Sequence, residues 1–258
     1  MTEIPRAKAS RIARPKVSHF DRSKTRFNRL QKLGELPKRV TFPSQFAKDL
    51  NANSGFATQQ GVVWKNGVHQ PGSDFFRAQK SRRESDPMIT FGFVGGPSQI
   101  KGWPTIKKAF QSLTHTQFRV ILVDGSMDGS WWKDHDFGDL PGDWQVYPRY
   151  AQNEMDAFYS QIDVLLFMSQ WKETFGLAIR EALARGISVI QTDSGGTVEH
   201  GGVTTQKLIP IGASPDELAA QISDKITQHP EYAGPIQTTS FEDQASAFHD
   251  LVNEVLTS

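Results

Sequence analysis

The segment spanning residues 164–199 constrains the fold more than any other part of the chain. Residues 164–167 are all apolar and predict a buried strand. Residues 175–184 carry apolar side chains at helical spacing after Thr174, which we expect to cap the helix. A glycine ends this helix, and residues 187–190 predict a second buried strand. Because strand, loop and helix recur, the segment predicts a parallel sheet whose loops bind ligands at the carboxyl ends of the strands.

The rest of the chain repeats this alternation of short apolar runs and amphipathic segments. Residues 77–86 are densely charged and predict a linker or exposed loop, and residues 126–144 predict an irregular segment that holds three tryptophans. The expected strands are 39–42, 61–64, 88–94, 118–123 and 144–147, and the other expected helices are one capped by Ser44, 104–113, 155–162, 215–229 and 241–256. We therefore expect an α/β fold, a Rossmann-like parallel sheet with helices on both faces.

Composition disfavours several classes of protein. No apolar run approaches the roughly 18 residues that a transmembrane helix needs, and the start lacks the apolar core of a signal peptide. Cysteine is absent, which excludes a disulfide framework and thiolate metal sites, and the seven histidines are scattered. The sequence therefore predicts a cytoplasmic protein without a structural metal or cofactor.

Positive charge is concentrated at the beginning of the chain. Residues 1–39 hold twelve Lys or Arg against three acidic residues, a net charge of +9, so the remaining residues sum to −8. Few large apolar side chains accompany this charge, so we expect residues 1–38 to form a mobile basic arm. Peripheral contact with anionic lipid headgroups at the inner face of the membrane is the second interpretation. Nucleic acid is the third, disfavoured because no aromatic interleaving or recognition helix accompanies the charge.

Two carboxylates mark the segment on which the fold depends. Glu173 precedes the expected helix and Glu181 lies about two turns into it, so they are separated by roughly 9–12 Å along the helix axis. This distance excludes a pair that shares one proton and suits two hydroxyl-bearing parts of one long ligand. Between them, the start of the helix offers free N–H groups, which favour phosphate. Taken alone, the spacing is more typical of two solvated glutamates on an amphipathic helix than of a ligand site.

The residues around the two glutamates reproduce the motifs of one known family. Glu173-Thr-Phe-Gly-Leu, Glu181-Ala-Leu-Ala-Arg-Gly and Gly195-Gly196-x-x-Glu199 follow in close order, after Phe42-Pro-Ser-Gln-Phe46 and Lys65-Asn-Gly-Val68 upstream. Over residues 40–256 the chain resembles the donor-binding, carboxyl-terminal half of retaining GT-B glycosyltransferases of glycosyltransferase family 4, also called glycosyl transferases group 1. That family includes bacterial mannosyltransferases and sucrose and glycogen synthases.

This resemblance implies a site for a nucleotide-diphospho-sugar, a UDP-, GDP- or ADP-sugar, without a metal. In the family, residues matching Lys101 and Glu173 act at the diphosphate and the donor sugar, so we take both as catalytic residues. The residue matching Glu181 binds the ribose hydroxyls, and backbone N–H groups of residues 175–177 face phosphate or sugar. The donor-binding residues implied in this way are Gly95, Gly96, Lys101, Glu173, Thr174, Phe175, Gly176, Leu177 and Glu181.

One position departs from the family pattern. Gly96 stands where the family has an arginine that, with the lysine, holds the donor diphosphate. The loss of this cation weakens electrostatic stabilisation of the leaving group. We expect that Gly96→Arg would tighten diphosphate binding if the loop is built as in the family. Tyr150 follows the strand near which the family places the base, and packing within the protein is the favoured interpretation for its ring.

The domain expectation follows from the same resemblance. We expect a basic arm in residues 1–38, a remnant of the acceptor domain and its connection in 39–87, and the donor-binding domain with a terminal helix in 88–258. The family's acceptor domain is much longer than residues 1–87, so that half is expected to be missing, truncated or supplied by a separate partner chain. The predicted reaction is retaining hexosyl transfer to a glycan or lipid acceptor, as in polysaccharide biosynthesis. A non-catalytic nucleotide-sugar-binding module and a GT-B epimerase are the alternatives.

Overall fold

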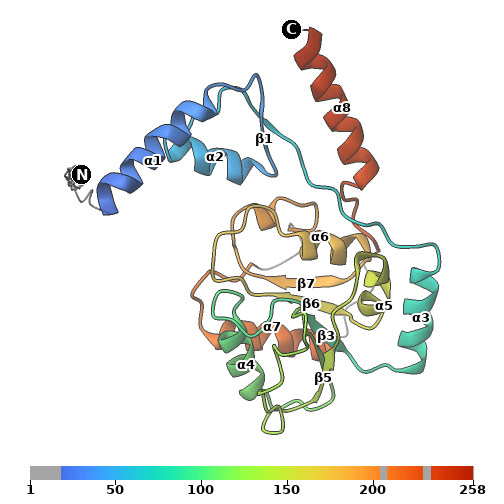
Figure 1. Cartoon of the computed structure of the whole chain (residues 1–258). Helices are drawn as coiled ribbons and strands as arrows, with labels where there is room; N and C mark the ends of the chain where they lie inside the picture. The colour runs from blue at the N-terminus through green and yellow to red at the C-terminus, as the bar shows by residue number, and fades with distance from the viewer. Residues whose placement is uncertain (1–18, 204–207, 229–233, 258) are drawn as a thin grey trace, which may run out of the picture.

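The computed structural model describes residues 19–203, 208–228 and 234–257. Its centre is a five-stranded parallel sheet with the strand order β5-β4-β3-β6-β7, and helices cover both faces of this sheet (Figure 1). The strands are β3 (Thr90–Phe93), β4 (Arg119–Val123), β5 (Asp143–Tyr147), β6 (Val164–Phe167) and β7 (Ser188–Gln191). The structure confirms the expected Rossmann-like α/β fold.

Alternating side chains of the strands divide the core between the two faces. On β6, Val164 and Leu166 pack on one side with helices α4 (Trp103–Gln111) and α7 (Pro215–Gln228). Leu165 packs on the other side, where the helices are α3 (Phe75–Ser85), α5 (Met155–Tyr159) and α6 (Leu177–Ala184). Both faces are apolar because a parallel sheet covered on both sides buries both sets of side chains.

The strand order reverses between β3 and β6. From β3 the chain continues through β4 to β5, and it then returns to β6 on the opposite side of β3 and continues to β7. The loops that follow β3 and β6 therefore leave the sheet in different directions at their carboxyl ends. Such a switch point is the usual ligand site of an open parallel sheet.

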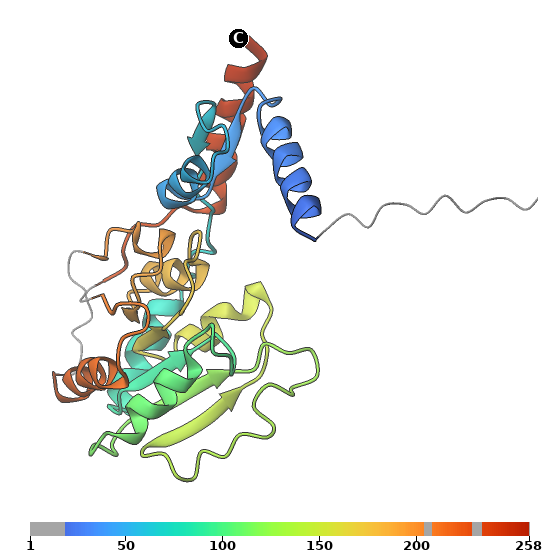
Figure 2. The same ribbon diagram turned by 90° about the vertical axis from the view of Figure 1, so that its left-hand side faces the viewer.

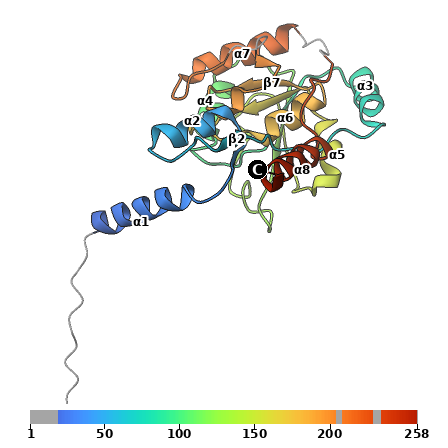
Figure 3. The same ribbon diagram turned by 90° about the horizontal axis from the view of Figure 1, so that it is seen from above.

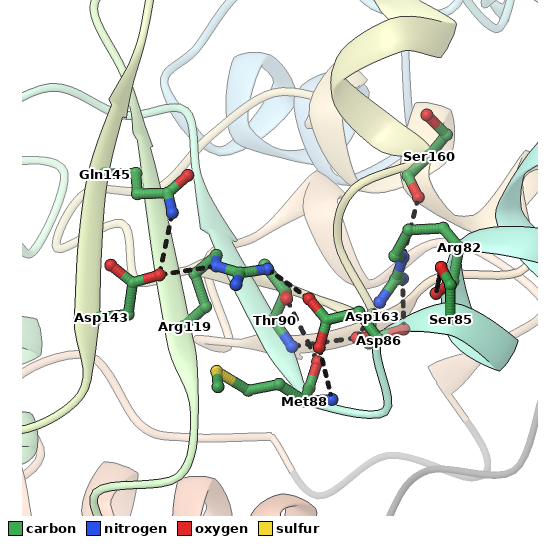
Figure 4. A network of polar contacts seen from close by, with 10 residues as sticks. All are labelled: Arg82, Ser85, Asp86, Met88, Thr90, Arg119, Asp143, Gln145, Ser160 and Asp163. Atoms are coloured by element: carbon green, nitrogen blue, oxygen red, sulfur yellow. Dashed lines mark hydrogen bonds and ion pairs between the residues drawn. The ribbon is translucent and has the colours of Figure 1, made fainter.

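The charged segment that was expected to be a linker or exposed loop is instead helix α3. Its Phe75 is buried in the core, and Arg82 and Arg83 both pair with Asp163, whose carboxylate also accepts a hydrogen bond from the N–H of Thr90. Figure 4 shows part of this network at the amino ends of the strands. The linker prediction was wrong because a high density of charged residues was taken to mean solvent exposure. Arg82 and Arg83 instead bind the carboxylate of Asp163, at the amino end of β6.

A smaller unit stands at the carboxyl edge of the large sheet. It contains β1 (Val40–Phe42), α2 (Gln45–Asn53) and β2 (Gly61–Val63), with β1 and β2 paired in parallel. The last helix, α8 (Phe241–Thr257), lies with this unit and not with the sheet (Figures 1 and 2). The Trp64 indole N–H donates to the carbonyl of Gln244, and the Trp64 ring lies 5.1 Å from that of Phe248.

Ordered structure begins earlier than Arg39. Helix α1 (His19–Gly34) occupies part of the segment expected to be a mobile arm, and it projects away from the rest of the chain (Figures 2 and 3). Its Gln31 side chain donates to the carbonyl of Gly55, and its Phe27 ring packs edge-on to Phe56. Residues 1–18, the remainder of the expected arm, lie outside the described residues. In the described part of the chain, no helix combines the length and hydropathy needed to cross a bilayer.

The described residues also form two short 3₁₀ helices, η1 (Gln152–Glu154) and η2 (Gly196–Val198). The expected helices capped by Ser44 and at 104–113, 215–229 and 241–256 are present, with bounds shifted by a few residues. The expected helix at 155–162 is shorter, and residue 229 lies outside the described residues. The domain boundaries at 38 and 87 remain a prediction.

Candidate functional site

The loops after β3 and β6 meet at the switch point. The N–H of Gln170 donates to the carbonyl of Ile100 over 2.7 Å, which joins the two loops directly. Gly102 permits this approach, since a Cβ atom there would lie 2.1 Å from the carbonyl oxygen of Met168. The backbone of Gly102 also has φ +80°, in the left-handed region that favours glycine.

A cavity of about 350 Å³ opens between these loops. Its walls come from the ends of β3 and β6, the start of α6, and Asn66 in the connection after β2. Predicted site residues that line it are Gly95, Lys101, Glu173, Thr174, Phe175, Gly176 and Leu177. The structure thus brings together seven of the nine predicted donor-binding residues, while Gly96 and Glu181 lie outside the lining.

The two predicted catalytic residues meet at this cavity. Lys101 Nζ lies 2.7 Å from Glu173 Oε1, and the Ser169 hydroxyl donates to the same carboxylate oxygen over 2.9 Å. Glu173 is held in turn by its backbone, because its N–H donates to the carbonyl of Ser194 and its carbonyl accepts from the N–H of Gly196. A half-exposed cation and a carboxylate therefore lie side by side, where one can bind phosphate and the other a sugar hydroxyl.

Helix α6 begins later than expected and without the expected cap. Gly176, with φ +81°, occupies the N-cap position, and Leu177 is the first helical residue. The prediction that Thr174 caps the helix was wrong. Its carbonyl oxygen accepts a hydrogen bond from the Ser44 hydroxyl over 2.6 Å, so residue 174 belongs to a loop fixed by the smaller unit.

Glu181 lies in a separate polar cluster beside the cavity. The Tyr159 hydroxyl donates to Glu181 Oε2 over 3.1 Å, and the same hydroxyl also contacts the carbonyl of Ala178. Burial raises the pKa of the Glu181 carboxyl, while the Tyr159 hydrogen bond and the charge of Arg185 act in the opposite direction. Only Glu181 Oε2 takes part in the Tyr159 bond, which leaves Oε1 able to accept from a ligand hydroxyl.

Trp131 explains why residue 96 is glycine. Gly96 has φ +70°, and a Cβ atom there would lie 2.7 Å from the ring of Trp131. The same ring would contact a Cβ atom on Gly125 at the end of β4. The structure therefore changes the expectation for Gly96→Arg. An arginine would meet both an unfavourable backbone conformation and an occupied position, so tighter diphosphate binding no longer follows from the added charge.

The other aromatic residues near the site are mostly packed. Tyr150 stacks on Phe158 at 5.4 Å, which confirms the packing interpretation of its ring. Trp132 is buried and donates its indole N–H to the carbonyl of Val123, whereas Trp131 remains 37% exposed. The third tryptophan of residues 126–144, Trp144, packs against the core that contains Trp132.

Sequence reasoning missed several residues whose hydrogen bonds fix the loops around the cavity. Arg180 is buried and bonds backbone carbonyls of two loops, and Ser169 orients Glu173. Glu199 accepts hydrogen bonds from the N–H groups of Gln45 and Phe46 at the start of α2. The motif G-G-x-x-E gave a signal for Glu199, but no pattern in one sequence connects it to a helix 150 residues earlier.

The described residues contain no group of three or more His, Cys, Asp or Glu side chains that could hold a metal ion. The polar groups gathered at and beside the cavity are those of Lys101, Glu173, Glu181 and the start of α6. This set can bind phosphate through a cation and N–H groups and can bind hydroxyl groups through carboxylates.

Known proteins were compared with the sequence and with the structure. The profile of the family described as "Glycosyl transferases group 1" matches residues 74–238, which contain the whole large sheet and end before α8. A search of curated proteins gave no match.

Solved glycosyltransferase structures share the fold. Sucrose-phosphate synthase from Thermosynechococcus elongatus matches with a TM-score of 0.71 and 20% identity, covering 91% of this chain and 62% of its own. Anabaena HepE in complex with UDP-glucose matches with a TM-score of 0.66 and 20% identity, covering 91% and 68%. A glycosyltransferase from Rickettsia africae matches with a TM-score of 0.63 and 21% identity, covering 90% and 62%. The chain thus spans about two thirds of the length of these proteins.

The family match covers more than half of the chain, and the solved structures that resemble it are GT-B glycosyltransferases. The motif Glu173-Thr-Phe-Gly-Leu lines the cavity at the switch point together with Lys101. The chain belongs to the group 1 family of glycosyltransferases.

Proposed function

We propose that this chain binds a nucleotide-diphospho-sugar in the cavity between β3 and β6 and takes part in retaining transfer of a hexose to a glycan or lipid acceptor. The observation that carries the proposal is the contact of Lys101 with Glu173 at the wall of a cavity that the start of α6 also lines. HepE, which shares the fold, has been solved with UDP-glucose. A nucleoside diphosphate joined to a hexose presents the phosphates and hydroxyls that this set of residues suits.

The roles follow from the chemistry of each group. Lys101 supplies positive charge to the diphosphate, which gains negative charge as the bond from the anomeric carbon to the phosphate oxygen breaks. The N–H groups at the start of α6 act on the same phosphates. Glu173 binds hydroxyls of the sugar, and Glu181 binds those of the ribose. Lys101 and Glu173 bind each other in the structure, and we expect donor binding to replace this ion pair by contacts to phosphate and sugar.

The test is thermal unfolding with a panel of UDP-, GDP- and ADP-sugars. A ligand that binds only the folded chain stabilises it by about 2.7 kcal/mol at a hundred times its dissociation constant. We expect one class of nucleotide to raise the melting temperature. We expect Lys101→Met to weaken binding of the nucleoside diphosphate and to leave binding of the nucleoside little changed. Lys108→Met is the matched control, since Lys108 is an exposed lysine on the last turn of the neighbouring helix α4. The absence of any shift in the wild type would contradict donor binding.

A non-catalytic donor-binding module is the second candidate. It is favoured by Gly96, because the family's second phosphate-binding cation has no counterpart at this position and Trp131 occupies the space. The transfer assay separates the two candidates: donor binding without transfer to any acceptor supports the module, and multiple turnover by the chain alone supports the complete enzyme. Release of free sugar isomerised at one carbon would favour an epimerase.

Two contact surfaces belong to the same proposal. Helix α8 borders a groove of about 390 Å³ with exposed Phe248, Val252 and Leu256, which suits a separate acceptor domain. Helix α1 carries Arg22, Lys24, Arg26, Arg29 and Lys32 together with exposed Phe27, Leu30 and Leu33, which suits peripheral contact with the anionic inner face of a membrane in the cytoplasm. Co-sedimentation with vesicles of anionic and of neutral lipid tests the second surface, and equal binding to both would contradict it.

A further inference from the structure

Arg180 is a buried cation directly beneath the site. It precedes Glu181 on α6 and is only 5% exposed. Its guanidinium lies 3.7 Å from the centre of the Phe175 ring. Desolvation lowers the pKa of Arg180 to about 10, which is still far above neutrality, so the side chain is charged under ordinary conditions. Burying such a charge is costly unless its donors are satisfied.

Every bond recorded for this guanidinium goes to a backbone carbonyl. One nitrogen, Nη1, contacts the carbonyls of Phe175 and Gly176, in the loop before α6. The other, Nη2, donates to the carbonyls of Gly196 over 3.0 Å and of Glu199 over 2.9 Å, in the loop after β7. The planar fork therefore joins two loops that lie about 20 residues apart in sequence, a geometry that lysine cannot reproduce.

No carboxylate of the described residues forms an ion pair with Arg180. Glu199, whose charge acts on Arg180, directs its carboxylate to the N–H groups of Gln45 and Phe46, at 2.9 and 2.6 Å. An arginine whose task was charge pairing would be placed next to a carboxylate, as Arg82 and Arg83 are next to Asp163. Arg180 instead spends its donors on fixing the direction of carbonyl groups.

The direction of these carbonyls determines the direction of the neighbouring N–H groups. In a planar trans peptide, the C=O and the following N–H point to opposite sides. The carbonyls of Phe175 and Gly176 point at the buried Arg180, so the N–H groups of Gly176 and Leu177 point away from it. Gly176 and Leu177 both line the cavity. None of the described residues accepts a hydrogen bond from these two N–H groups, as expected at the start of a helix.

We propose that Arg180 is a positioning residue that holds the peptide groups of residues 175–177 with their N–H groups directed at the diphosphate of the donor. The inference rests on the proposed function and deepens it. It states that the Arg180 side chain, which does not itself reach the ligand, fixes the orientation of the phosphate-binding peptide groups. Through the same hydrogen bonds, Arg180 ties the loop 173–176 to the loop 195–199.

The experiment compares Arg180→Lys and Arg180→Met with the wild type. Calorimetry measures binding of UDP, GDP and ADP, each next to its own nucleoside. We expect Arg180→Met to weaken binding of the nucleoside diphosphate about tenfold or more and binding of the nucleoside less than about twofold, because the lost hydrogen bonds involve the phosphates. Arg180→Lys keeps the charge but not the planar fork, so we expect its affinity for the diphosphate to lie between those of the wild type and Arg180→Met. A purely structural role would weaken diphosphate and nucleoside alike.

Arg119→Met is the matched control. Arg119 is a partly buried arginine that pairs with Asp86 and Asp143 at the amino edge of the sheet. We expect it to lower the melting temperature without changing the ratio of diphosphate to nucleoside affinity. A change in that ratio as large as that of Arg180→Met would overturn the proposal.

Hydrogen exchange of the ligand-free protein separates this inference from the proposed function. The N–H groups of Glu173 and Gly196 bond the two loops to each other, and we expect both to exchange faster in Arg180→Lys than in the wild type. Unchanged exchange in a variant would overturn the role of Arg180 even if the wild type binds nucleotide. A wild type that binds none of the three diphosphates would overturn the proposed function, and with it the ligand that the inference names.

Discussion

Charged side chains are arranged differently at the two ends of the strands of the large sheet, which we call its amino edge and its carboxyl edge. At the amino edge, Asp163 binds Arg82 and the N–H of Thr90, and Arg119 pairs with both Asp86 and Asp143 (Figure 4). Arg83 also pairs with Asp163. Each charge there has a partner of opposite sign. At the carboxyl edge the buried Arg180 bonds carbonyl oxygens, the start of α6 leaves N–H groups directed at a cavity, and Lys101 and Glu173 remain partly exposed.

The difference separates charges that stabilise from charges that bind. An ion-pair network holds α3 to the amino ends of β3 and β6, and its charges are paired with one another. The carboxyl edge keeps its hydrogen-bonding capacity available at the place where the strand order reverses. Substitutions at the amino edge should therefore change the free energy of unfolding and leave binding alone, and those at the carboxyl edge should change binding first.

The largest expected effect is on stability, from Asp163→Ala. The side chain is 8% exposed, and its removal leaves Arg82 without its carboxylate partner in a partly buried position. Breaking a buried pair of this kind costs about 3 kcal/mol or more. Urea denaturation measures the loss, and Asp143→Asn, whose carboxylate is 45% exposed, should cost less than about 1 kcal/mol. The folded Asp163→Ala protein should bind nucleotide with the affinity of the wild type. A different affinity would contradict the separation of stabilising and binding charges between the two edges.

Glu181→Ala should give the largest change in binding. A carboxylate that accepts hydrogen bonds from ribose hydroxyls contributes about 1.5–3 kcal/mol for each bond, so we expect nucleotide affinity to fall tenfold or more. Tyr159→Phe is the control, because it removes the hydroxyl that holds Glu181 Oε2 and keeps the carboxylate itself. Equal affinities of wild type and Glu181→Ala in calorimetry would exclude the ribose assignment.

Gly96→Arg should lower stability by about 1–3 kcal/mol, because φ +70° is unfavourable for arginine and the Trp131 ring occupies the space of its side chain. Diphosphate binding should not tighten. In a Trp131→Ala background, the same substitution should cost less, since the steric part is relieved. A tighter diphosphate complex in the single variant would show that the loop rearranges and that charge outweighs packing.

The smallest effect is a pH dependence from His200, which lies next to Arg180. Burial lowers the pKa of His200 to about 4, and the charge of Arg180 acts in the same direction. Unfolded histidine takes up its proton near pH 6.5, so between about pH 6.5 and 4 the unfolded state binds more protons. The free energy of unfolding should therefore fall by about 1–2 kcal/mol as the pH is lowered through this window, a value reduced because the ring is only partly buried.

Carboxylates also titrate at the lower end of this window, so the His200 contribution is the difference between the wild type and His200→Gln. Exposed His249, replaced in the same way, serves as the control. A pH profile of stability that is the same for wild type and His200→Gln would contradict the assignment.

Local patterns gave the sheet and most of the cavity wall, because motifs at the ends of buried strands are read along the chain. Lys101 and Glu173 were predicted and do meet, since parallel strands place their carboxyl ends at one edge. Contacts between distant segments could not be predicted in this way. The pairing of Arg82 with Asp163, the bond of Glu199 to α2 and the ring of Trp131 over Gly96 each depend on two segments that only the tertiary fold brings together. Arg180 was missed because an arginine at a helix position predicts solvent exposure unless its acceptors are known.

Hydrogen exchange with and without the nucleotide sugar that stabilises the protein most tests the central claim directly, namely that the carboxyl edge at the switch point is the binding edge. The account predicts slower exchange in residues 95–102 and 169–181 when the ligand is bound, and unchanged exchange at Thr90, Asp163 and residues 82–86 at the amino edge. Protection confined to the amino edge or to the α8 groove, with none in residues 169–181, would contradict it.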